Sequence, residues 1–136
     1  MLLSSRDFQR AARQRFTTAE FLLRNRYNLD AMYLAGYTVE CSLKALILES
    51  TDELDRPSTL KKISSGTKMH SAEVLTGKLQ ELGCSIPLDL KRRLYRFIKT
   101  WSTDLRYRTG HVDTGETRGF LKTAKFVLDW VEKQLP

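Results

Sequence analysis

Residues 29–50, "LDAMYLAGYTVECSLKALILES", constrain the fold more than any other part of this sequence. If the segment is helical, apolar residues cover most of its circumference, which is typical of a helix buried on nearly all sides. Small residues recur at steps of three and four along one stripe: Ala31, Ala35, Thr38, Ser42 and Ala45. Because small side chains let a second helix approach closely, we expect this helix at the centre of a helical bundle.

The same segment contains two charged residues in its most apolar part. Glu40 and Lys44 are four residues apart, in the order that favours an ion pair on a helix. We expect the pair either to be half-exposed at an edge of the helix or to be kept for a reason other than stability. Asn28 or Asp30 can cap the beginning of this helix.

Four further segments have apolar residues at helical spacing, and none alternates β-branched residues as a strand does. We expect these helices after Ser4 or Ser5, over 71–82, over 87–101 and over 117–135. Residues 50–70 are polar and contain paired serines, a proline and a glycine, so we expect a long loop with at most a helical turn near Leu60. The sequence therefore predicts an all-α antiparallel bundle of about five helices, as one domain over residues 1–136.

The cysteines and the apolar runs narrow the class of protein. Cys41 and Cys84 are the only cysteines, they lack CxxC spacing, and there are only two histidines, so we expect no zinc site and no cofactor. No apolar run approaches the roughly 18 residues of a membrane helix, and the first residues lack the pattern of a secretory signal. We expect a cytoplasmic protein with reduced thiols that does not span a membrane.

Positive charge is concentrated in one part of the chain. Residues 91–108 contain seven Lys and Arg residues against one Asp, which gives 7 − 1 = +6 of the net charge of +7. On the helix expected over 87–101, Arg92, Arg96 and Lys99 fall opposite the apolar face. Such a field attracts polyanions or an acidic partner, although a solvated helix face has the same composition.

The stretch "DLRYRTGHVDTGE" follows that helix and contains candidate catalytic residues. Arg106 and Arg108 can hold phosphate oxygens, and His111 can transfer a proton near neutral pH. This set suits attack of a ribose 2′-hydroxyl on the adjacent phosphodiester without a metal ion. Tyr95 and Tyr107 can stack on bases. The alternative is that the same residues form only a basic connecting loop, in which Asp113 or Glu116 caps the next helix.

Two stretches together resemble the HEPN family, the "higher eukaryotes and prokaryotes nucleotide-binding" domain. They are "AMYLAGYTVECSLKALIL" at 31–48 and "WSTDLRYRTGHVD" at 101–113, and "KMHSAEVLTGKL" adds a weaker match. The resemblance implies a helical bundle that forms a homodimer. Many members of the family have an R-x(4–6)-H motif, which Arg106 and His111 match with four residues between them.

For this chain, the resemblance implies two functions that stay open. One is a metal-independent endoribonuclease of the toxin type, paired with a small nucleotidyltransferase antitoxin, in which Arg106 stabilises phosphate charge and His111 transfers the proton. The other is a non-catalytic nucleotide-binding protein or partner subunit of a nucleotidyltransferase. In the first case, the flanking RNA backbone is expected to contact Arg92, Arg96, Lys99, Tyr107 and Arg108.

Overall fold

The computed structural model describes residues 3–65, 71–101 and 109–136. The helices in these residues are α1 (Ser5–Arg24), α2 (Asn28–Ser50), the short 3₁₀ helix η1 (Glu53–Asp55), α3 (Arg56–Ile63), α4 (Ala72–Glu81), α5 (Leu88–Thr100) and α6 (Thr114–Gln134). No strand occurs in the described ranges. The predicted all-α bundle is confirmed, with six α-helices there instead of about five.

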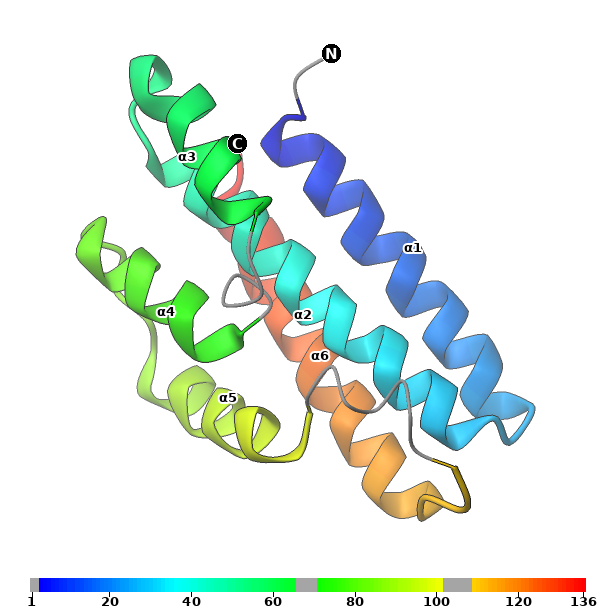
Figure 1. Cartoon of the computed structure of the whole chain (residues 1–136). Helices are drawn as coiled ribbons and strands as arrows, with labels where there is room; N and C mark the ends of the chain where they lie inside the picture. Colours follow the sequence, from blue (N-terminus) through cyan, green and yellow to red (C-terminus); the bar gives the residue numbers. More distant parts are fainter. Residues whose placement is uncertain (1–2, 66–70, 102–108) are drawn as a thin grey trace.

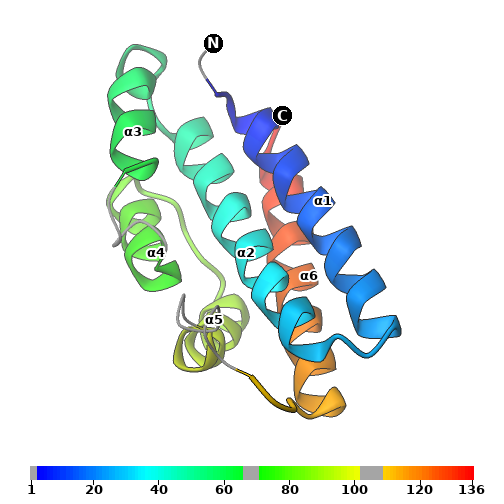
Figure 2. The same cartoon turned by 45° about the vertical axis from the view of Figure 1, so that its right-hand side comes forward.

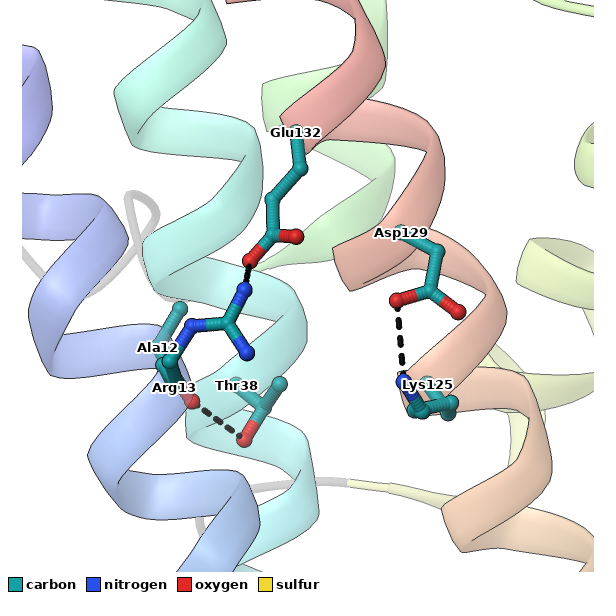
Figure 3. A network of polar contacts seen from close by, with 6 residues as sticks. All are labelled: Ala12, Arg13, Thr38, Lys125, Asp129 and Glu132. Atoms are coloured by element: carbon teal, nitrogen blue, oxygen red, sulfur yellow. Dashed lines mark hydrogen bonds and ion pairs between the residues drawn. The ribbon is translucent and has the colours of Figure 1, made fainter.

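Helix α2 lies at the centre of the bundle, as its sequence predicts. Figures 1 and 2 show α1 and α6 along it on one side and α4 and α5 on the other. All five residues of the small-residue stripe are completely buried. The hydroxyl of Thr38 donates a hydrogen bond of 3.2 Å to the carbonyl of Ala12 in α1 (Figure 3). That bond crosses the helix pair directly, because no bulky side chain stands between the two backbones.

The apolar length of α2 corrects one expectation from the sequence. By length and composition, Asn28–Ser50 is a candidate membrane span, so an apolar run of the required length does exist. However, 78% of its most apolar window is buried inside the protein. The helix is therefore accounted for as the core of the bundle, where neighbouring helices supply the apolar surroundings.

The prediction of a long loop over residues 50–70 was only partly correct. Residues 53–63 form η1 and α3, and the side chain of Ile63 is completely buried in the core. Pro57 lies in the first turn of α3, where its missing N–H costs no hydrogen bond. A helix this short is stabilised mainly by packing against its neighbours. Because its own sequence is mostly polar, the sequence alone predicted no more than a helical turn there.

Two helix starts also differ from expectation. Tyr27, rather than Asn28 or Asp30, is the N-cap of α2, because the Asn28 amide makes tertiary hydrogen bonds instead. Helix α6 begins at Thr114 rather than 117, since the Asp113 carboxylate accepts a hydrogen bond of 3.0 Å from the N–H of Glu116. The capping role of Asp113 is thereby confirmed. At α1, Ser4 and Asp7 form a reciprocal capping box.

Candidate phosphate-binding site

Helix α5 separates its apolar and basic residues onto opposite sides. Leu90, Leu94 and Phe97 are buried against the rest of the bundle. On the outer side, a shallow hollow of about 450 Å³ is lined by Lys91, Arg92, Tyr95 and Arg96. We call these four residues together with Lys99 the basic face of α5.

An exposed aromatic ring lies in the middle of this basic face. Tyr95 is 60% exposed, and the ammonium of Lys99 lies 4.4 Å from the centre of its ring. Among the described residues, the side chains of Lys91 and Arg92 have no hydrogen-bond or ion-pair partner. Arg93 is directed away from this face, with its guanidinium 4.2 Å from the ring centre of Phe126. The face therefore combines a ring available for stacking with cations available to an anion.

The connection between α5 and α6 is attached to α2 at both described ends. At the start, the indole N–H of Trp101 donates a hydrogen bond of 3.2 Å to the carbonyl of Tyr33. At the finish, the side-chain amide of Asn28 donates to the carbonyl of Val112 and to the hydroxyl of Thr114, both at 2.9 Å. Both anchors lie in the first half of α2.

Trp101 packs directly on the backbone of α2. A Cβ atom added to Gly36 would lie 1.9 Å from the indole nitrogen, so only glycine leaves room for the ring there. The ring also contacts Tyr33, Tyr37 and Phe97, with ring centres 5.6–6.3 Å from its own. This aromatic cluster explains why Trp101, at the end of α5, is only 8% exposed.

A buried ion pair lies on the same face of α2. Lys44 donates a hydrogen bond of 3.1 Å to Glu40, and both side chains are more than nine-tenths buried. Gly36, Glu40 and Lys44 are four residues apart, so they lie along one face of the helix. The structure thus excludes the expectation that Glu40 and Lys44 are half-exposed at an edge of the helix. A buried pair of this kind adds little net stability, although removing one partner is costly.

The structure places some of the predicted site residues and not others. Arg92, Arg96 and Lys99 are exposed on α5, and His111 is exposed in the bend after Gly110, whose φ is +98°. Arg106, Tyr107 and Arg108 lie outside the described residues, so the arrangement of Arg106 with His111 stays a prediction. The anchoring by Gly36 and Asn28 was not predicted from the sequence. For Gly36, the available signal was a glycine in the interior of a long apolar helix.

Both cysteines are free thiols that are partly buried. Burial raises the pKa of Cys41 to about 11, with the negative charge of Glu40 acting in the same direction, and burial also raises the pKa of Cys84. Neither is therefore activated as a nucleophile. In the described parts of the chain, no three His, Cys, Asp or Glu side chains gather as metal ligands.

Comparison with known proteins agrees with this architecture. The family model of the HEPN domain matches residues 5–134, nearly the whole chain. The protein belongs to the HEPN domain family, a class of nucleotide-binding and ribonuclease-like helical domains. No curated protein and no solved structure matches the chain.

Proposed function

We propose that this HEPN protein binds the phosphate groups of RNA or of a nucleotide on the basic face of α5. The observation that carries the proposal is the grouping of Lys91, Arg92 and Arg96 around the exposed ring of Tyr95. Guanidinium groups donate paired hydrogen bonds to phosphate oxygens, and an exposed ring stacks on a base. Both features suit a nucleic-acid strand better than a simple inorganic anion.

The sharper form of the proposal is a metal-independent endoribonuclease. His111 would remove the proton from a ribose 2′-hydroxyl, and that oxygen would attack the adjacent phosphorus. The bond to the 5′-oxygen would then break, the leaving oxygen would take up a proton, and a cyclic phosphate would remain. Arg106 would stabilise the charge that develops on the phosphate oxygens. Exposure of His111 supports the proposal, because the imidazole is accessible to a strand bound on the surface.

We also propose that the protein acts as a homodimer, which would bring two sets of Arg106 and His111 together. The support for this form is the family membership of the chain.

Binding is tested with a labelled single-stranded RNA and a variant that removes two cations from the basic face. Arg92→Ala with Arg96→Ala should weaken RNA binding, and the slope of log K against log salt should fall by about 1.4, since each lost phosphate contact removes about 0.7. Arg118→Ala with Lys122→Ala is the matched control, because it removes two exposed cations from α6. Equal affinity in both variants would contradict the proposal.

Cleavage is tested separately with His111→Ala. If the protein is an endoribonuclease, this variant should lose cleavage and keep RNA affinity, and EDTA should leave the wild-type rate unchanged. A wild-type protein that binds RNA but never cleaves it would refute the enzymatic form and leave the binding function in place.

The second candidate is a non-catalytic partner of a small nucleotidyltransferase. The same basic face favours it, because an acidic protein surface would be attracted to these cations. In that case Arg92→Ala with Arg96→Ala should abolish binding of the nucleotidyltransferase. RNA affinity should then be low in the wild type and unchanged in the variant.

A further inference from the structure

A second basic depression lies between α1 and α6, away from the α5 face. It has a volume of about 330 Å³, and its lining comprises Phe16, Glu20, Leu23, Arg24, Arg118, Leu121, Lys122 and Lys125. Phe16 and Leu121 are almost fully buried and form an apolar floor with the half-buried Leu23. We call this depression the α1–α6 groove.

The rim of the groove is strongly cationic. Its four Lys and Arg residues against Glu20 give 4 − 1 = +3. Lys125 already pairs with Asp129 at 3.0 Å (Figure 3), but no described residue makes a hydrogen bond or ion pair with the side chain of Arg24, Arg118 or Lys122. An apolar floor with free cations around it fits a ligand that presents an apolar side chain between negative charges.

The 3₁₀ helix η1 presents such a group. Leu54 is 95% exposed, and its neighbours Asp52, Glu53 and Asp55 contribute a charge of −3. The N–H of Asp55 donates a hydrogen bond of 2.8 Å to the carbonyl of Asp52, which closes the turn and holds Leu54 at its tip. Folding does not explain this leucine, because its side chain contacts no part of the core. We call residues 52–55 the acidic turn.

The acidic turn and the α1–α6 groove lie at opposite ends of the bundle. The turn precedes α3 at the end where α2 finishes, whereas the groove lies where α1 finishes and α6 begins (Figures 1 and 2). One chain therefore cannot place its own acidic turn in its own groove. A second copy can supply the turn, and each chain offers both halves of the contact.

We propose that the acidic turn of one copy docks in the α1–α6 groove of a second copy, with Leu54 on the apolar floor and its three acidic neighbours among the rim cations. Because the two halves lie at opposite ends, the contact is head-to-tail. It differs from a two-fold homodimer and does not depend on the proposed function. A single turn buries far less than the roughly 1,200 Å² of a stable interface, so the association is expected to be weak and sensitive to salt.

The first test measures mass by sedimentation equilibrium at low salt, up to roughly 1 mM protein. The average mass of the wild type should rise with concentration, and the rise should shrink in high salt. Leu54→Ser should remove the rise, while Leu88→Ser, which changes another exposed leucine, should keep it. Any two-fold contact is common to all three proteins and sets only the baseline mass. A wild-type mass that does not change with concentration, or a Leu54→Ser protein that behaves as the wild type does, would overturn the proposal.

The second test changes the groove. Arg118→Glu with Lys122→Glu should also remove the concentration-dependent rise, whereas Lys91→Glu with Arg92→Glu, an equal change of charge on α5, should leave it in place. The groove variant keeps its acidic turn, and Leu54→Ser keeps its groove. A mixture of these two proteins should therefore associate although neither does so alone. If the mixture stays at the baseline mass, or if the groove variant loses RNA affinity but associates normally, the groove serves another ligand and the proposal fails.

Discussion

Gly36→Ala tests how the connection between α5 and α6 is held. The added Cβ would lie 1.9 Å from the indole nitrogen of Trp101 and 2.0 Å from its Cε2 atom. These distances are far inside van der Waals contact, so the indole ring must leave its position. The ring cannot move without breaking the hydrogen bond to the carbonyl of Tyr33 and its packing in the aromatic cluster.

The size of the effect follows from opposing contributions. Complete loss of a buried tryptophan side chain costs about 3–5 kcal/mol, including its hydrogen bond, and sets the upper limit. Replacing a helical glycine by alanine returns about 1 kcal/mol of helix propensity. The free energy of unfolding should therefore fall by about 2–4 kcal/mol, which lowers Tm by roughly 8–15 °C for a chain of this size.

The assay is thermal and urea unfolding followed by circular dichroism, with tryptophan fluorescence to report exposure of the indole. Gly77→Ala in α4 and Gly119→Ala in α6 are matched controls, because an added Cβ there meets nothing within 4 Å. Both controls should stabilise the protein by about 0.5–1 kcal/mol. In a Trp101→Leu background, Gly36→Ala should be neutral or stabilising, since the ring it collides with is gone.

Two results would refute this reasoning. If Gly36→Ala is as stable as the two control variants, Trp101 does not occupy the space above Gly36. If Gly36→Ala costs as much in the Trp101→Leu background as in the wild type, the cost arises from something other than the indole ring. Either result would remove the basis for regarding this contact as the anchor of the connection.

Three further predictions concern side chains that are partly or fully buried. Because burial raises the pKa of Cys41 to about 11, its alkylation rate, followed by mass spectrometry, should rise about tenfold per pH unit between pH 8 and pH 10. A plateau of the rate within that range would contradict the raised pKa. Asn28→Ala removes two hydrogen bonds, one to Val112 and one to Thr114 at the start of α6, and should lower the free energy of unfolding by about 1–2 kcal/mol in urea titrations. No change would mean that these bonds do not hold the connection. Lys44→Met leaves the Glu40 carboxylate buried without its ammonium partner and should lower the free energy of unfolding by about 3–5 kcal/mol, measured as a lower Tm. Adding Glu40→Gln to the same chain should recover part of this loss.

Prediction from sequence worked where the signal was local and periodic. The apolar helix over 29–50 and the amphipathic helix over 87–101 were both located to within two residues. The pairing of Glu40 with Lys44 also followed from their spacing, because residues four apart on a helix are neighbours whatever surrounds them. The family resemblance rested on part of the same helix, residues 31–48, together with residues 101–113, and was confirmed by the match over 5–134.

Prediction failed where a contact between distant residues decided the outcome. Helix α3 exists because Ile63 is buried by other parts of the bundle, and its own composition favours a loop. Asn28 resembled a cap in the sequence, but its amide contacts residues more than eighty positions away. The roles predicted for Arg106 and His111 stay predictions, since Arg106 lies outside the described residues.

The sequence by itself determined the helical class, the central position of α2 and the concentration of positive charge on α5. These properties depend on periodicity and composition, which repeat within a few residues and are readable in one dimension. Only the tertiary structure decided that Trp101 lies on Gly36, that the α1–α6 groove combines an apolar floor with unpaired cations, and that Leu54 lies at the opposite end of the bundle. Such features arise when residues distant in the chain are packed together, and no local pattern specifies which ones will meet.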